Sequence, residues 1–205
     1  MLKDIKIVDT TLRDGEQTAG VVFSNAEKLA IAKMLSEAGV YQIEVGVPAM
    51  GGAEKEAIKT MVSAGLKCSL MGWNRAISKD IEASIECGLD AVAISISVSD
   101  VHIKEKLAKD RTEVLATMSQ TINFAKSHVL YVSANAEYAS RADPEFLLTF
   151  IKNAQDAGAD RFRYCDTTGS LDPISAFEKT RELTQKTGMP IEIHTHNDFG
   201  MATGN

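Results

Sequence analysis

The stretch IECGLDAVAISIS, residues 85–97, contains the structural unit that recurs along the chain. It begins with residues suited to the end of a helix, passes through Gly88, and continues as a run of small and β-branched residues. A glycine in this place is typical of a helix that ends in a left-handed cap. A short run with little polar interruption is typical of a parallel strand buried on both faces. The stretch therefore predicts a helix followed by a buried strand.

Three other stretches have the same layout: SEAGVYQIEVG (36–46), VSAGLKCSLMGW (62–73) and QDAGADRFRYCDT (155–167). Their glycines, at positions 39, 65 and 158, are again expected in left-handed caps. Helix starts are also visible, with a capping box from Ser24 to Glu27 and aspartate–proline pairs at 143–144 and 172–173. We expect strands near residues 5–9, 41–46, 67–72, 90–97, 129–134, 161–166 and 190–195, with six helices between them.

Two of the predicted helices have apolar residues at i, i+3, i+4 and i+7, a spacing that places them on one face. We expect each such stripe to face the core. The stripes consist of Ile31, Met34, Leu35 and Ala38 in the first helix, and Leu147, Phe150, Ile151 and Ala154 in the second.

Alternating strands and helices predict an α/β fold with a parallel sheet, either an open doubly wound sheet or a (β/α)8 barrel. No glycine-rich fingerprint follows the first strand, which disfavours a dinucleotide-binding sheet. A complete barrel takes about 250 residues, whereas seven strands and six helices fill the 205 residues of this chain. We therefore predict a (β/α)8 TIM barrel that is incomplete. Residues 1–205 would form one catalytic domain without the last strand and helix and without a C-terminal accessory domain.

The composition excludes several classes of protein. A net charge of −6 leaves no basic stripe for nucleic acid. No apolar run reaches the roughly 18 residues that a membrane helix needs. Cys68, Cys87 and Cys165 lie in apolar stretches without metal-type spacing, which predicts buried free thiols. Because the start, MLKDIKIVDT, also has no secretory signal, we expect a cytoplasmic protein.

Most predicted strands run from apolar residues into a polar cluster. In a barrel, catalytic residues gather at the carboxyl ends of the strands, so these clusters are expected to lie at one rim. The clusters are DTTLRDGEQ (9–17), EVGVPAMG (44–51), SANAEYASR (133–141), YCDTTG (164–169) and HTHND (194–198).

The last cluster contains a pair of histidines. His194 and His196 are two residues apart on a strand, so their side chains project from the same face. The pair could be two hydrogen-bonded surface histidines or two metal ligands. In a closed barrel Asp14, after the first strand, could add a carboxylate, giving a divalent site with open positions. Iron oxygenases use the same ligand types, but their usual all-β scaffold conflicts with this pattern.

Other polar residues allow a structural or a functional interpretation. Glu44 interrupts a buried strand, where a carboxylate needs a partner. It could pair with a neighbouring arginine or line the site. Glu137 and Arg141 could belong to the site or form a loop salt bridge. Trp73 and Arg75 could line the mouth of the barrel or cover its rim, and the charged loop 12–17 could simply be solvated.

The stretches DTTLRDGEQ, EVGVPAMG, YCDTTGSLDP and HTHNDFGMATGN resemble the condensing enzymes of the DRE-TIM metallolyase superfamily, which include isopropylmalate, citramalate and homocitrate synthases. The resemblance covers the whole chain. VGVPAMGGAE and LMGWNR are most similar to homocitrate synthases of nitrogen fixation. The resemblance implies an acyltransferase that performs a metal-dependent Claisen condensation of acetyl-CoA with a 2-oxo acid, 2-oxoglutarate in a homocitrate synthase.

The resemblance also implies roles for individual residues. The metal ligands would be Asp14, His194 and His196, holding Mn, Mg, Zn or Co. The catalytic residues would be Arg13 and Glu137, the latter in proton transfer. The substrate-binding residues would be Arg13, Gln17, Glu44 and Thr167, and Asn197 would orient His196.

Two departures leave the substrate open. Tyr138 follows Glu137 where the superfamily usually has an acidic or small polar residue, and Ser133 stands where lysine-pathway homocitrate synthases have an arginine. The alternatives are a 2-isopropylmalate, citramalate or Re-citrate synthase, a lyase of the same superfamily, or a catalytically silent subunit or fragment that needs a partner chain. The homocitrate synthases that this chain resembles include split forms made of two subunits. The resemblance therefore implies that a complementary subunit or a homo-oligomer completes the barrel.

Overall fold

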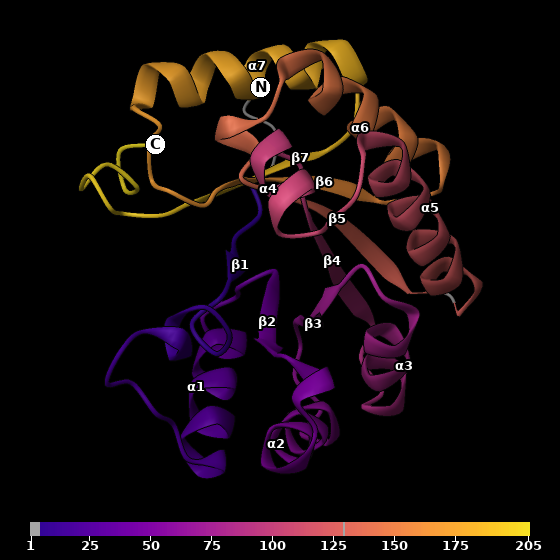
Figure 1. Ribbon diagram of the computed structural model, residues 1–205. Helices are drawn as coiled ribbons and strands as arrows, with labels where there is room; N and C mark the ends of the chain where they lie inside the picture. Colours follow the sequence, from indigo (N-terminus) through magenta and orange to yellow (C-terminus); the bar gives the residue numbers. More distant parts are fainter. Residues whose placement is uncertain (1–4, 129) are drawn as a thin grey trace. The chain divides into compact units, whose positions relative to one another are not determined.

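The computed structural model describes residues 5–128 and 130–205, in two compact units (Figure 1). Unit 1 extends through Ala93, and unit 2 starts at Ile94. The strand β4 (Ala91–Ser97) contains the division.

Unit 1 contains three further strands, which pair in parallel and in chain order. Val8 lies opposite Gln42, and Ile43 lies opposite Leu70. Helix α1 packs against α2, and both contact β2. The elements are β1 (Val8–Asp9), η1 (Gly15–Gln17), α1 (Asn25–Glu37), β2 (Gln42–Gly46), η2 (Pro48–Met50), α2 (Gly52–Ser63), β3 (Ser69–Arg75) and α3 (Ser78–Glu86).

In unit 2 the strands again follow chain order, and β5, β6 and β7 pair in parallel, with Cys165 opposite His194. Helices α5, α6 and α7 each contact the corresponding strand and lie along one face of these three strands (Figure 1). The elements are α4 (Asp100–Glu105), α5 (Arg111–Ser127), β5 (Tyr131–Glu137), η3 (Ala139–Arg141), α6 (Pro144–Asp156), β6 (Arg161–Asp166), α7 (Pro173–Thr187) and β7 (Ile191–Thr195).

The predicted alternation and the predicted helix ends are confirmed. The four glycines at helix ends have positive φ angles, for example 78° at Gly88. Ser24 and Glu27 form the expected capping box, and Asp143 and Asp172 cap α6 and α7.

The structure adds one helix and changes the ends of several predicted strands. Strand β1 spans Val8–Asp9 and is shorter than the predicted range 5–9. The short helix α4 was not expected, so the described residues contain seven α-helices instead of six. Strand β3 continues to Arg75, because the side chain of Asn74 donates to the backbone carbonyl of Gly72 and is thereby accommodated in the interior. Strand β5 begins at Tyr131, after the expected start; Val129, the first residue of the predicted range, lies outside the described residues.

The predicted core face of α1 is wrong in part. Met34 is 69% exposed, and the line of buried residues on α1 runs through Lys28, Ala32 and Ser36. These residues lie at i, i+4 and i+8, so α1 is rotated relative to the face that the apolar stripe predicts. The reason is the buried ammonium group of Lys28, which pairs with two carboxylates. The predicted stripe of α6 is confirmed, since all four of its residues are buried.

The cysteines are free thiols, as predicted. Cys87 and Cys165 are buried, and Cys68 is half-buried. Burial raises the pKa of the Cys87 thiol, which therefore stays protonated at neutral pH. Among the helices of the described residues, none has the length and apolar character needed to cross a membrane.

The packing of α6 on β6 gives a first prediction. Phe150 is fully buried and meets the ring of Phe162 edge-on, with 6.3 Å between ring centroids. We expect Phe150→Ala to lower the free energy of unfolding by about 3–5 kcal/mol, because it removes buried surface and leaves a cavity. Phe177→Ala on α7, where the residue is 62% exposed, is the matched control, with an expected loss below about 1 kcal/mol. Equal losses in urea denaturation would contradict this packing.

Candidate functional site

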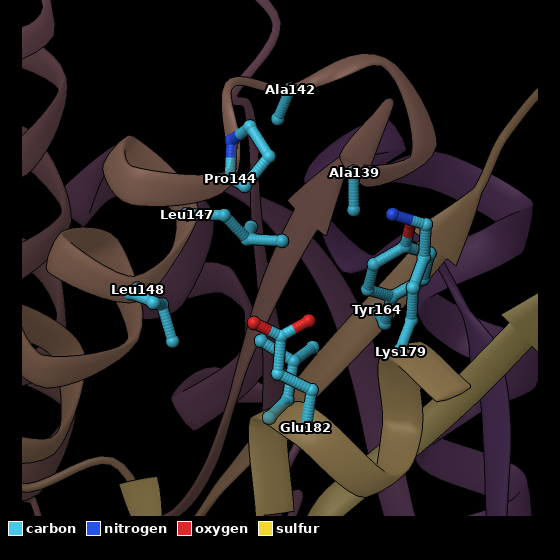
Figure 2. A pocket seen from close by; sticks show the side chains of 9 residues that line it. Ala139, Ala142, Pro144, Leu147, Leu148, Tyr164, Lys179 and Glu182 are labelled. Carbon is cyan, nitrogen blue, oxygen red and sulfur yellow. The ribbon is translucent and has the colours of Figure 1, made fainter. Parts of the chain in front are cut away.

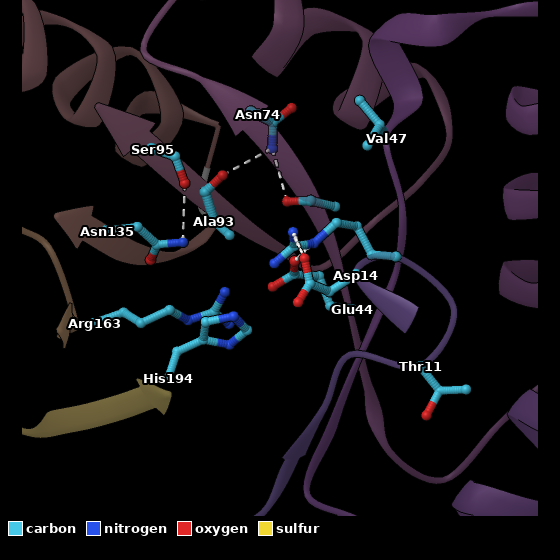
Figure 3. Close-up of polar contacts among 12 residues, drawn as sticks. Thr11, Asp14, Glu44, Val47, Asn74, Ala93, Ser95, Asn135, Arg163 and His194 are labelled. Atoms are coloured by element: carbon cyan, nitrogen blue, oxygen red, sulfur yellow. Dashed lines mark hydrogen bonds and ion pairs between the residues drawn. The ribbon is translucent and has the colours of Figure 1, made fainter. Parts of the chain in front are cut away.

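The turn after β1 and the middle of β2 in unit 1 carry a charged cluster (Figure 3). The guanidinium of Arg13 donates through Nε to Glu44 and through Nη1 to Asp14, the latter at 2.7 Å. The side chain of Glu44 is fully buried, and that of Arg13 is 10% exposed. The buried carboxylate therefore has the arginine partner that its position requires. The guanidinium carbon also lies 5.9 Å from the centroid of the Trp73 ring.

A tight backbone turn fixes the positions of Arg13 and Asp14. The carbonyl oxygen of Thr10 accepts from the backbone N–H groups of Arg13, Asp14 and Gly15, at 3.1, 2.8 and 3.1 Å. The turn leads directly into η1. Gln17, at the end of η1, is exposed, so it does not contribute to the buried part of the cluster.

Lys28 fastens this loop to the rest of unit 1. The residue is 5% exposed, and its Nζ lies 2.6 Å from Glu16 and 2.5 Å from Glu54. The other oxygen of Glu54 accepts from the backbone N–H of Val47 at 3.0 Å. Burial by itself lowers the pKa of Lys28, but the two carboxylates outweigh it and raise the pKa above its usual value. The ammonium group therefore stays charged and joins the loop after β1 to the loop after β2.

Gly46 makes room for that arrangement. Its φ angle is 140°, and the pairing register between β2 and β3 shifts between Glu44 and Gly46. A Cβ atom at this position would collide with the carboxylate of Glu54. Only glycine meets both conditions.

In unit 2, His194 of β7 and His196, one residue beyond the end of β7, converge. The Nε2 atoms of His194 and His196 lie 3.3 Å apart, and both residues are half-buried. Two imidazole nitrogens that each lie 2.0–2.1 Å from one tetrahedral ion are separated by roughly 3.3–3.4 Å. The pair therefore has the spacing that a shared divalent cation requires. A single hydrogen bond between neutral imidazoles would give a similar distance.

Glu137, at the end of β5, accepts two hydrogen bonds. The hydroxyl of Ser97 donates at 3.0 Å and the ammonium of Lys106 at 3.1 Å. The salt-bridge partner of Glu137 is thus Lys106. Arg141, the partner suggested by the sequence, is exposed on η3. Lys106 caps the carboxyl end of the short helix α4, which was not predicted, so no sequence pattern indicated its role.

The turn after Glu137 is held in a strained conformation. Tyr138 has a φ angle of 58°, which is uncommon for a residue with a side chain. Its backbone N–H donates to the hydroxyl of Thr167 at 2.9 Å, and its ring stacks on His102 with 3.7 Å between centroids. Thr167, which the resemblance assigned to substrate, therefore also supports the turn that carries Glu137.

A buried polar network on β4 to β7 was missed in the sequence. Glu192 forms ion pairs with Arg161 at 2.6 Å and with Arg163 at 2.7 Å. Arg161 also donates to the hydroxyl of Ser133, and Asn135 donates to Ser95 at 3.1 Å (Figure 3). The strand period of two could have revealed Glu192, since it has the same parity as the two histidines.

The loops around the histidines have their own supports. Asp166 accepts from the backbone N–H of Leu171 at 2.8 Å and from the hydroxyl of Ser170 at 3.2 Å. Burial opposes ionisation of Asp166, but these hydrogen bonds hold its pKa below the usual value. Gly169 lies close to the backbone carbonyl of His196. A Cβ atom at position 169 would lie only 2.8 Å from that carbonyl oxygen. The side-chain oxygen of Asn197 accepts from Ala202 and so braces the following loop.

Comparison with known proteins identifies relatives over the whole chain. The HMGL-like family profile matches residues 4–205. "2-isopropylmalate synthase 2" of Caldanaerobacter subterraneus is 57% identical, with 99% of this chain and 53% of that protein covered. "Homocitrate synthase 1" of a Nostoc species is 48% identical, with 100% and 54% covered. "Homocitrate synthase subunit alpha" of Clostridium pasteurianum is 46% identical, with 98% and 75% covered. The chain thus spans about half the length of the first two relatives.

The solved structures agree on the fold. HMG-CoA lyase of Bacillus subtilis superposes with a TM-score of 0.82 at 22% identity, covering 99% of this chain and 72% of that one. HMG-CoA lyase of Brucella melitensis superposes with a TM-score of 0.81 at 19% identity, covering 98% of this chain and 75% of that one. These similarities concern the fold alone. They confirm the predicted (β/α)8 class, of which the described residues contain seven parallel strands.

The role of Lys28 can be tested by substitution. Lys28→Met leaves two half-buried carboxylates without their cation, so we expect a loss of roughly 3 kcal/mol in the free energy of unfolding, at the low end of the cost of breaking a buried pair. Lys33→Met, at an exposed position of the same helix, should change it by less than about 0.5 kcal/mol. If the two variants unfold at the same urea concentration, the ion pairs of Lys28 do not hold this loop.

Asp166 gives a pH-dependent prediction. Because its pKa is lower in the folded chain, its ionised form stabilises the fold above the unfolded pKa of about 3.9. This contribution is lost as the pH falls through the lower, folded pKa. We therefore expect Asp166→Asn to be less stable than the natural chain at pH 7, with the difference shrinking below about pH 4. Asp156→Asn, at the exposed end of α6, should show a much smaller pH-dependent difference in urea denaturation.

Proposed function

Because the chain belongs to the HMGL-like family, in the homocitrate and 2-isopropylmalate synthase group of the DRE-TIM superfamily, we propose that it carries the catalytic residues of a metal-dependent acyltransferase. The proposed reaction is the condensation of acetyl-CoA with a 2-oxo acid. The observation that carries the proposal is the 3.3 Å separation between the Nε2 atoms of His194 and His196.

The proposed metal ligands are Asp14, His194 and His196. Each offers one oxygen or imidazole nitrogen, a donor set that suits Mn, Mg, Zn or Co. A bound divalent cation would act as a Lewis acid that polarises the keto group of the 2-oxo acid. The proposal requires the carboxylate of unit 1 and the imidazoles of unit 2 to bind the same ion.

Arg13 is proposed to stabilise negative charge on the 2-oxo acid. A guanidinium can hold a carboxylate or a developing oxyanion with two N–H groups. Glu44 and Asp14 accept from Arg13 and so fix the direction of its side chain. Glu44 would act mainly through Arg13. Gln17 and Thr167 remain proposed contacts to the substrate.

Glu137 is proposed to take part in proton transfer. In the condensation the methyl group of acetyl-CoA loses a proton to a base, and the methyl carbon then bonds to the keto carbon. The keto oxygen receives the electron pair of the C=O bond and takes up a proton, which gives a hydroxyl group. A water molecule hydrolyses the thioester and releases CoA. The carboxylate of Glu137 can accept a proton, and Ser97 and Lys106 hold it in one orientation.

For the 2-oxo acid we propose 2-oxoglutarate, which would make the enzyme a homocitrate synthase. The names of two relatives support this, including the one that the chain covers over 75% of its length. A 2-isopropylmalate synthase is the second candidate, favoured by the relative with 57% identity. A role in nitrogen fixation and a cytoplasmic location stay predictions.

A further polypeptide segment is proposed to cover β7 and the start of α7. Ile193 on β7 is 37% exposed, and the nearby sequence adds Ile174, Phe177 and Phe199, which are 62–70% exposed. Apolar residues exposed in such number are typical of a surface that another element covers. The segment could belong to the same polypeptide, to another copy of the chain or to a complementary subunit. The name "subunit alpha" of one relative supports the last of these.

The metal site is tested by titrating the chain with Mn²⁺ or Zn²⁺ in a calorimeter. We expect Asp14→Ala, His194→Ala and His196→Ala each to weaken binding by at least about 100-fold, since loss of a mere supporting partner costs 10–100-fold. His128→Ala, an exposed histidine after α5, is the control and should bind like the natural chain. If Asp14→Ala binds the metal ion as tightly as the natural chain, Asp14 is not a ligand.

The reaction is tested by incubating the chain with metal, acetyl-CoA and one 2-oxo acid at a time. Each reaction is run with and without the product of the neighbouring gene, and the products are identified by mass spectrometry. Homocitrate from 2-oxoglutarate would support the proposal, and 2-isopropylmalate would support the second candidate. If no condensation product forms with any 2-oxo acid in either condition, the chain is a catalytically silent subunit.

A further inference from the structure

A pocket in unit 2 lies between η3, α6 and α7, on the helix-covered side of β6 (Figure 2). Its volume is about 30 Å³. Most of its wall is apolar and consists of alanine, proline and leucine side chains from η3, α6, α7 and the loop before α6. Three polar residues complete the wall: Tyr164 on β6, and Lys179 and Glu182 on α7.

The hydroxyl group of Tyr164 sets this pocket apart from an ordinary packing gap. Tyr164 is 3% exposed, and its hydroxyl oxygen has no hydrogen-bond partner within the described residues. Burial, and to a lesser degree the charge of Asp166, raises the pKa of this hydroxyl. It therefore keeps its proton at neutral pH and can act as a donor. A buried polar group without a partner destabilises the fold, so such groups usually bind a water or another guest.

The neighbouring residue on the same face of β6 shows that this position does not need a hydroxyl for packing. Phe162 is two residues earlier, so its side chain lies on the same face as that of Tyr164. Phe162 is fully buried and packs against Phe150 of α6. A phenylalanine at position 164 could fill its place on β6 in the same way. The hydroxyl at this position thus points to a polar guest.

The polar groups of the wall indicate what kind of guest fits. The Tyr164 hydroxyl and the Lys179 ammonium are both donors. The acceptor in the wall, Glu182, is already paired with Lys186 at 2.6 Å. A guest should therefore accept hydrogen bonds. The volume of about 30 Å³ exceeds the roughly 10–15 Å³ that one water needs but excludes a large ligand.

We propose that this pocket is a binding site for one small hydrogen-bond acceptor, held by the Tyr164 hydroxyl. Ordered water and a small carboxylate such as acetate share the required chemistry. Ala139 of η3 is part of the wall, and η3 follows Glu137 and Tyr138 directly. The guest would thus lie beneath the turn that carries Glu137. The inference does not depend on the proposed reaction, in which none of the residues of the wall takes part.

The test uses the whole chain with labelled methyl groups and no carboxylate in the buffer. Nuclear Overhauser effects from water to the methyls of Leu147 and Leu183 report an ordered water, and a titration with acetate reports a carboxylate. We expect a water signal or a saturable acetate shift at these methyls, and its loss in Tyr164→Phe. Tyr41→Phe, at a half-buried tyrosine of unit 1, should keep the signal and serves as the control.

Two further results separate the possible outcomes. Lys179→Met should weaken acetate binding several-fold but leave a water signal in place, which distinguishes the two guests. An empty pocket would give neither signal, and Tyr164→Phe would then unfold at a higher urea concentration than the natural chain, because an unsatisfied hydroxyl has been removed. That combination would overturn the proposal. Because Tyr164→Phe retains the ring and Lys179 lies on the surface helix α7, both variants are expected to fold.

Discussion

The imidazoles of His194, on β7, and of His196, just after it, impose the constraint on which the functional account depends. A strand period of two places His194 and His196 on one face, and the structure brings their Nε2 atoms to 3.3 Å. At this distance the two nitrogens can form one hydrogen bond or bind a common cation. Neighbouring residues hold the backbone around this histidine pair in place. Gly169 lets the loop after β6 approach the carbonyl of His196, and Asn197 braces the chain that follows.

Buried ion pairs hold the remaining candidate residues in place. Arg13 is fixed by Glu44 and Asp14, and the loop that carries it is fastened by Lys28. In each case a charge is buried with its partner, an arrangement that is expensive to break and therefore favours one geometry over alternatives. In unit 2, Lys106 and Ser97 orient Glu137. Both units thus present polar side chains at the carboxyl ends of their strands on a backbone that is held by internal charges.

The elements of the fold were predictable because their signals are local. A glycine at a helix end followed by an apolar run predicts a strand from about a dozen residues, and the capping residues mark where helices begin. The orientation of α1 was not predictable in this way. Its apolar stripe suggested a face containing Met34, whereas the structure buries Lys28, whose partners are 12 and 26 residues away in the sequence. Lys106 was missed for the same reason, since its pairing with Glu137 spans 31 residues. The histidine pair was recognisable because its members are two residues apart at the end of a predicted strand, whereas the convergence of Asp14 with them stays a proposal.

The most direct measurement is pulsed electron paramagnetic resonance of Mn²⁺ bound to the whole chain. The account predicts modulation from two directly coordinated imidazole nitrogens, reduced to one in His194→Ala and in His196→Ala, while His128→Ala keeps both. Bound Mn²⁺ without any nitrogen coupling would contradict it, because the imidazole pair would then be joined by its own hydrogen bond and would have no part in holding an ion.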